Sequence, residues 1–269
     1  MHVLISSECS VVPLSSKPLV SEGDALLNFL HILDYDSADP PLADLLRRYH
    51  HLEGEWLVLS PVHWEATHND AMIVASGKEL QLKEIESKSC FNLFAQYLAE
   101  EDKVLFYHNK QTWLLYHDKS QALNAKPVHH LLNLSLMPEL AKLDNTMYWQ
   151  KFFTESQMFF ASRTNQSKIN GIWLWGSAKL KDKKAIKVCA DEYFLSIAQI
   201  CSSNVTLYSP SVMLKEYEIL LITDFFMLSE HHQEELKKKT VDWYWNNVAY
   251  TAKSSNWFTR LWRKLSYAN

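Results

Sequence analysis

Glycine is scarce in this chain, with only five residues among 269, although glycine usually makes up about 7% of a protein. Loops that hold a phosphate group need several glycines close together, because a Cβ atom keeps the backbone N–H groups away from the anion. Neither the dinucleotide-binding pattern GxGxxG nor the phosphate-binding pattern GxxxxGK(S/T) occurs. The sequence therefore excludes the common dinucleotide-binding and P-loop classes of protein.

Cysteines are also few. The four of them, Cys9, Cys90, Cys189 and Cys201, are scattered, and no CxxC pair occurs. Structural zinc sites and disulfide-rich folds need cysteines at short, paired spacings. We therefore expect four reduced thiols, most of them buried in the core.

Long hydrophobic runs and an excess of positive charge are missing as well. The longest apolar stretch, near Ile219 to Leu228, is interrupted by Asp224 and is too short for a membrane span. No lysine or arginine precedes Lys17, so the start of the chain does not have the pattern of a secretory signal. The formal net charge is -4, and an attractive field for nucleic acid needs the opposite sign. We expect a cytoplasmic protein with no transmembrane segment and no nucleic-acid partner.

Hydrophobic residues make up 47% of the chain, which is enough for a sizeable core. Patterns typical of strands, such as those at 104–107, 113–116 and 172–175, alternate with helical patterns, one of them capped by Asp24. This alternation favours an α/β fold, with a mixed sheet flanked by helices. A long helix is predicted from 229 to about 250.

The polar loop at 120–127 is the expected boundary between two segments of the chain. It divides an N-terminal α/β segment, residues 1–125, from a C-terminal α/β segment, residues 126–269. The alternative is that both segments belong to one continuous domain.

Three short motifs resemble the RpfE-type family of bacterial regulatory proteins. The first is SPVH at 60–63 with HND at 68–70, similar to the family pattern DPVH…(R/H)xD. The second is Trp149 followed by ESQM at 155–158, similar to W…ExQM. The third is NGIWLWG at 170–176, which matches Nx(I/L)WxWG. The resemblance implies a regulatory protein and does not name a mechanism.

The third motif is also similar to a segment of the archaeal-type cofactor-independent phosphoglycerate mutases. That resemblance implies a reduced alkaline-phosphatase-like fold, two divalent metal ions and a serine or threonine nucleophile. In that family the first metal ligand is an aspartate directly after the first strand, whereas residues 6–9 read SSEC here and no aspartate precedes Asp24. The residues favour a non-enzymatic regulatory or binding protein of the RpfE type that needs no cofactor. The alternative is a 2,3-bisphosphoglycerate-independent phosphoglycerate-mutase-like, metal-dependent phosphotransferase.

The densest group of metal-ligand side chains consists of His63, Glu65, His68 and Asp70. Side chains alternate along a strand, so His63 and Glu65 share one face, and the other two can return across a turn. If the protein binds a divalent metal, we expect Mn or Zn at His63, His68 and Asp70. The alternatives are a polar loop that faces a substrate and a plain polar turn, and the residues favour the plain turn.

A ligand site is predicted around the third motif. Trp173 and Trp175 share one face of the expected strand, where two indoles can form a platform for a ligand, although packing inside a covered sheet explains the same alternation. Asp224 follows a core strand, where it can meet a ligand or cap the next helix. We expect a small anionic ligand or a protein partner to bind near seven residues: Asn170, Trp173, Trp175, Gly176, Lys179, Glu155 and Asp224.

Two further features are predicted to have ordinary roles. Adjacent histidines occur at 50–51, 129–130 and 231–232, and we expect them on solvated faces of helices. The segment 257–264 mixes aromatic and basic residues. Its aromatic side chains can pack on the fold, or the segment can contact a membrane surface, nucleic acid or an acidic partner.

Overall fold

The computed structural model describes residues 1–14, 16–117, 121–162 and 168–252. The basic-aromatic segment 257–264 therefore lies outside the described residues. The chain divides into two compact units. Unit 1 combines residues 1–34 with the residues from 181 onward, and unit 2 comprises residues 35–180. The boundary predicted near residue 125 lies inside unit 2, because the first strand of the chain belongs to the same sheet as the last ones.

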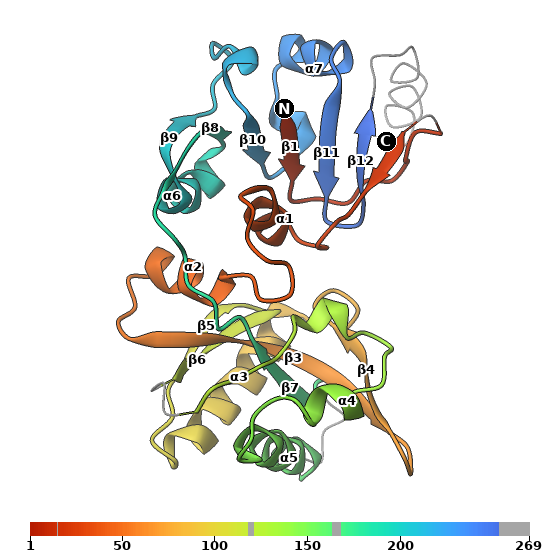
Figure 1. Ribbon diagram of the computed structural model, residues 1–269, viewed down its shortest axis with the longest axis vertical. Helices are drawn as coiled ribbons and strands as arrows, with labels where there is room; N and C mark the ends of the chain where they lie inside the picture. Colours follow the sequence, from red (N-terminus) through yellow and green to blue (C-terminus); the bar gives the residue numbers. More distant parts are fainter. Residues whose placement is uncertain (15, 118–120, 163–167, 253–269) are drawn as a thin grey trace. The chain divides into compact units, whose positions relative to one another are not determined.

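Unit 1 contains a seven-stranded sheet (Figure 1). Its five parallel strands have the spatial order β11-β1-β10-β8-β9, and two further strands extend it antiparallel beside β11 in the order β12, then β2. The strands are β1 (His2–Ile5), β2 (Lys17–Leu19), β8 (Lys184–Ala190), β9 (Ser202–Leu207), β10 (Ile219–Ile222), β11 (Val241–Trp245) and β12 (Ala249–Ala252).

Three α-helices flank this sheet, and each begins at a side chain that caps it. Asp24 accepts backbone N–H groups at the start of α1 (Ala25–Ile32), as predicted. Asp191 and Ser229 do the same for α6 (Glu192–Cys201) and α7 (Glu230–Lys237). Two 3-10 helices, η2 (Leu214–Glu216) and η3 (Phe225–Met227), precede and follow β10. The predicted α/β fold with a mixed sheet and flanking helices is confirmed.

The helix predicted from 229 to about 250 is wrong, since α7 ends at Lys237 and is followed by β11 and β12. The reason is a long-range contact: β11 pairs in parallel with β1, from His2 opposite Asp242 to Ile5 opposite Trp245. Strand β10 is aliphatic and completely buried, and so are Val3 to Ile5 of β1, as expected for parallel strands covered on both faces.

Unit 2 is built on an antiparallel sheet around one long strand, β3 (Glu55–Ala66). The other strands are β4 (Ala71–Ser76), β5 (Leu105–Asn109), β6 (Thr112–His117) and β7 (Gly171–Trp175). Strand β3 pairs with β4, β6 and β7, and β5 pairs with β6 in the hairpin that the sequence predicts. The helices are α2 (Leu42–Tyr49), α3 (Glu84–Ala99), α4 (Met137–Leu140), α5 (Tyr148–Ala161) and the 3-10 helix η1 (Val128–His130).

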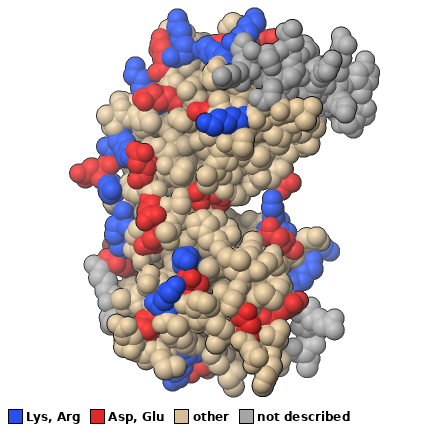
Figure 2. Space-filling view, turned by 45° about the vertical axis from the view of Figure 1, so that its right-hand side comes forward, with Lys and Arg blue, Asp and Glu red and all other residues tan. Residues whose placement is uncertain are grey.

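Two further expectations concern the whole chain. All four cysteines are free thiols and three of them are buried, as predicted. Within the described residues, no helix is long and apolar enough to cross a membrane. On the face shown in Figure 2, basic and acidic side chains are interspersed and do not gather by sign.

Candidate functional site

The two tryptophans of the NGIWLWG motif are buried in the core of unit 2. The exposed fraction of Trp173 is 0% and that of Trp175 is 3%. The Trp173 ring stacks on Phe153 with centroids 5.0 Å apart, and its Nε1 donates to the Lys126 carbonyl oxygen at 2.9 Å. Nε1 of Trp175 donates to Oγ of the buried Ser60, also at 2.9 Å. These contacts favour the packing interpretation over a ligand platform, because neither indole face is open to solvent.

The other residues of the motif also support the fold. The Asn170 side chain accepts from the Trp64 N–H at 2.6 Å and donates to the Trp64 carbonyl at 2.8 Å, so both of its polar groups are used. At Gly171, a Cβ would lie 2.7 Å from the Trp64 indole, so only glycine fits there. Gly176 ends the strand in the left-handed region at φ 78°.

The predicted charged residues near this motif lie on the surface. Nζ of Lys179 is paired with Oε2 of Glu55 at 2.9 Å. Glu155 is paired with Lys151 at 3.5 Å, one helical turn away on α5. Glu155 also lines a hollow of about 680 Å³ beside the start of α5. The structure therefore does not bring Lys179, Glu155 and Asn170 together around one ligand position.

The predicted metal ligands are not assembled either. His63 Nδ1 is hydrogen-bonded to the Lys168 carbonyl at 3.0 Å. Oδ1 of Asp70 accepts from Ser135 Oγ at 2.7 Å and from the N–H of the following residue. Among the described residues, His63, His68 and Asp70 do not form a group of three ligand atoms close enough to hold one ion. The hydrogen bond from Thr67 N to the Asp70 carbonyl at 2.8 Å identifies this segment as a hairpin turn.

The carboxyl edge of the parallel sheet in unit 1 is the usual place for a ligand in an α/β fold. The chain leaves β8 toward β9 and leaves β10 in the opposite direction toward β11, so a crevice is expected between β8 and β10. Here Asp191 occupies that position, and its carboxylate accepts from Thr223 N (2.6 Å), Thr223 Oγ1 (2.7 Å) and Phe194 N (3.1 Å). Asp224 caps η3 through Phe226 N. The side chains at this edge are thus used to hold the strand ends and helix starts.

The adjacent histidines are less solvated than the sequence predicts. His232 is buried: its Nε2 is bonded to the Val212 carbonyl and its Nδ1 to the Tyr208 hydroxyl, both at 2.9 Å. His50 Nε2 is 2.8 Å from Nδ1 of His108 on β5. Burial, followed by the charge of His50, lowers the pKa of His108 to about 4. The prediction of solvated faces is wrong where strands and neighbouring turns cover the rings.

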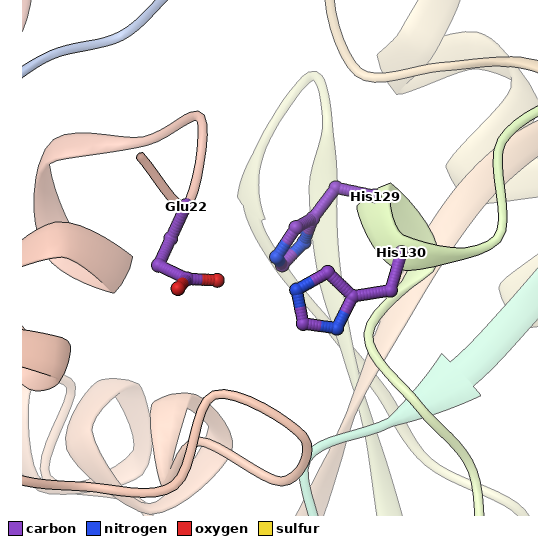
Figure 3. A group of neighbouring side chains, drawn as sticks. All are labelled: Glu22, His129 and His130. Atoms are coloured by element: carbon purple, nitrogen blue, oxygen red, sulfur yellow. The ribbon is translucent and has the colours of Figure 1, made fainter. Parts of the chain in front are cut away.

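His129 and His130 follow one another in η1 of unit 2 and are half-buried (Figure 3). Their ring centroids are 4.3 Å apart in a T-shaped arrangement, and the His129 ring lies 6.2 Å from that of Trp175. Glu22, the third residue drawn, belongs to unit 1. There its N–H donates to Asn28 Oδ1 at 2.8 Å.

A cavity of about 520 Å³ opens at the amino edge of the unit 1 sheet. This volume lies within the usual range for small-molecule sites. Its walls come from the amino-terminal parts of β1 and β8, the end of α1 and the segments that lead into β10 and β11. The lining residues are Met1, His2, Ile32, Ile186, Lys215, Tyr217, Glu218, Lys239 and Thr240.

The polar lining of this cavity includes two lysines and one glutamate. Lys239 is paired with Glu235 on α7, and among the described residues Lys215 has no ion-pair partner. Glu218 is the one acidic residue of the lining, and its Oε1 accepts from the Lys187 N–H at 3.1 Å. Burial, and then the amino group of Met1, lower the pKa of His2, although Asp242 lies 3.5 Å from its Nδ1. The lowered pKa of His2 favours its neutral form, so the cationic side chains of the lining are Lys215 and Lys239, and Lys239 is already paired with Glu235.

Sequence reasoning missed this cavity because its residues come from five separate segments of the chain. No two of the polar lining residues form a recognised motif, and Lys239 was placed inside a predicted helix. Only the parallel pairing of β1 with β10 and β11 brings His2, Glu218 and Thr240 to the same edge.

Comparisons with known proteins identify no relative of this chain. No family model matches the chain, and no curated protein or solved structure matches it significantly. The resemblance to RpfE-type proteins and to phosphoglycerate mutases therefore stays a prediction from the motif residues.

Proposed function

We propose that this chain is a non-enzymatic regulatory protein that binds a small organic anion in the amino-edge cavity of unit 1. One observation carries the proposal. The cavity has the size of a small-molecule site, and its charged lining contains Lys215 and Lys239 against the single carboxylate of Glu218. That carboxylate already accepts a backbone N–H group, so it repels an anion less than a free one.

The lining also indicates what kind of anion fits. Ile32, Ile186 and Met1 supply apolar surface, and Tyr217 offers a half-buried aromatic ring. A carboxylate or phosphate near Lys215 makes a charge-assisted hydrogen bond, which contributes about 1.5–3 kcal/mol. The favoured ligand is therefore a small, partly apolar molecule with one or two acidic groups at one end.

The hydrogen bonds of the polar side chains at the carboxyl edge of the sheet favour a role without catalysis. In an α/β enzyme, reactive side chains stand at the carboxyl ends of the parallel strands. Here Asp191 and Asp224 accept backbone N–H groups at helix starts, and Thr223 donates to Asp191. These hydrogen bonds are what an α/β scaffold needs for its own stability.

A binding experiment with matched variants tests the proposal. The probes are inorganic phosphate, citrate and 3-phosphoglycerate, measured by isothermal titration and by the shift in melting temperature. We expect at least one organic anion to bind the wild type, and we expect Lys215→Glu with Lys239→Glu to weaken that binding more than about tenfold, since two attractive charges become repulsive. Lys238→Glu is the control, because Lys238 is exposed and does not line the cavity.

Two results would overturn the proposal. One is equal binding of the probes by the wild type and the double variant, or binding by neither. The other is conversion of 3-phosphoglycerate to 2-phosphoglycerate in a coupled assay with Mn²⁺, abolished by His63→Ala. That second result would establish the phosphotransferase alternative.

A further inference from the structure

Residues 193–214 of unit 1 contain no aspartate, glutamate, lysine or arginine. Charged residues make up 22% of the chain, so a stretch of this length would ordinarily hold about five of them. The next longest uncharged stretch, 127–138, is little more than half as long. The uncharged segment covers most of α6, all of β9 and the connection to η2.

Strand β9 is the last strand of the unit 1 sheet (Figure 1). It pairs with β8 on one side, and within the described residues no strand pairs with its outer side. The Asn204 N–H is bonded locally to Ser202 Oγ, whereas Val205 to Leu207 continue the regular parallel register with β8. Thr206 and Leu207 are exposed, Leu207 to 48%.

At the other end of the same sheet, the edge strand has features that disfavour pairing with another chain. Strand β2 has only three residues, and it carries Lys17 and Pro18, which both disfavour pairing with another chain. Strand β9 is twice as long and carries neither a charge nor a proline. It also contains valine and threonine, which favour strands. The two edges of one sheet therefore differ in whether they can accept a further strand.

The helix beside β9 continues the uncharged surface. Tyr193, Ser196 and Ile200 share one face of α6 at positions i, i+3 and i+7, and the Tyr193 side chain is 60% exposed. Ser196 is exposed and Ile200 is half-buried. Depletion of charge together with an exposed tyrosine is typical of the centre of a protein interface.

We propose that β9 pairs antiparallel with β9 of a second copy of this chain, which joins two seven-stranded sheets into one. Two identical edge strands related by a two-fold axis are necessarily antiparallel. Near such an axis every charged side chain meets its own copy and is repelled, so a neutral segment suits a homodimer. Serine, threonine and asparagine each carry a donor and an acceptor and can pair with themselves.

Sedimentation velocity over a wide concentration range tests this interface. The wild type is expected to form a dimer, and Thr206→Lys with Leu207→Lys is expected to raise the dimer Kd more than about tenfold, because four lysines then meet across the axis. Both positions are exposed, so the circular dichroism and melting temperature should stay unchanged. The matched control is Thr154→Lys with Met158→Lys on the exposed face of α5 in unit 2. A wild type that is monomeric at every concentration, or a double variant that dimerises like the wild type, would overturn the proposal.

A single cysteine tests the pairing geometry. Thr206 is the middle residue of the run Val205 to Leu207 that pairs regularly with β8, and a two-fold axis at the centre of this run brings its two copies together. In a Cys90→Ser background, Thr206→Cys is expected to form a disulfide-linked dimer on mild oxidation, and Thr154→Cys is expected to stay monomeric. A wild-type dimer together with no cross-link at Thr206 would contradict a pairing centred on this residue.

Discussion

The two units bury different kinds of side chain at the centres of their sheets. In unit 1 the neighbouring strands β1 and β10 contribute the aliphatic runs VLI and ILLI, all completely buried. In unit 2 the strands around β3 contribute five buried tryptophans: Trp56, Trp64, Trp113, Trp173 and Trp175. The central strands β1 and β10 of unit 1 thus bury aliphatic side chains, although the neighbouring strand β11 adds the buried ring of Trp243, whereas the sheet of unit 2 buries several large rings around β3.

This difference shows why the most distinctive residues of the chain serve its core and do not line the cavity of unit 1. Tryptophan, asparagine and glycine in NGIWLWG stand out in a sequence, yet each of them satisfies a packing or hydrogen-bonding need inside unit 2. The cavity of unit 1 is lined by ordinary lysines, isoleucines and a tyrosine. An unusual motif therefore indicates an unusual core more directly than it indicates a function.

The largest expected effect is on the aromatic core of unit 2. Trp173→Ala removes a ring stacked on Phe153 and leaves the Lys126 carbonyl without its donor. We expect the free energy of unfolding to fall by about 3–5 kcal/mol, as for other buried aromatic truncations. Urea unfolding followed by circular dichroism measures it. Met158→Ala, at an exposed position of the same unit, should change stability by less than about 0.5 kcal/mol.

The next effect concerns the strand ends of unit 1. Asp191→Ala leaves the Thr223 N–H, the Thr223 hydroxyl and the Phe194 N–H without their acceptor. We expect a loss of about 2–4 kcal/mol, from one lost helix cap and the buried donors left unpaired. Asp224→Ala removes a cap from the short η3 only and should cost about 1 kcal/mol. If both variants lost the same free energy of unfolding, this would contradict the conclusion that Asp191 stabilises the fold more than Asp224 does.

A third effect is a pH dependence of the stability of unit 2. The pKa of His108 falls from 6.5 to about 4 on folding, because burial and then His50 disfavour its charged form. The unfolded chain therefore binds a proton that the folded chain rejects, so stability is full above pH 6.5 and is lost as the pH falls toward 4. His108→Gln should flatten the dependence of the melting temperature over this range, and an unchanged slope in this variant would contradict the burial of a neutral His108.

The local features of the fold could be predicted from the sequence. Apolar alternation and turn residues identify the strand at 172–175, the hairpin around residue 110 and the helix capped by Asp24, because nearby residues decide these elements. The strands β11 and β12 pair with each other, but their places in the sheet depend on β1 and β2, which lie more than 200 residues away, and these places could not be predicted. Strand propensity depends on such partners.

The candidate site was harder to predict for the same reason. Asp224 was correctly placed directly after a core strand, and the helix-cap interpretation of its role is the one that its hydrogen bond to Phe226 favours. Lys215, Glu218 and Lys239 come together only when β1 inserts between β10 and β11. A sequence pattern within one segment cannot predict that residues from distant segments lie together.

An NMR titration of the uniformly labelled protein with 3-phosphoglycerate and citrate tests the central claim most directly. We predict that the amide signals of His2, Lys215 to Glu218 and Thr240 shift as the anion binds, while the indole N–H signals of Trp173 and Trp175 stay in place. Shifts of these two indole signals, with the cavity residues unchanged, would contradict the claim that the ligand site lies in unit 1 and that the tryptophan motif serves the core of unit 2.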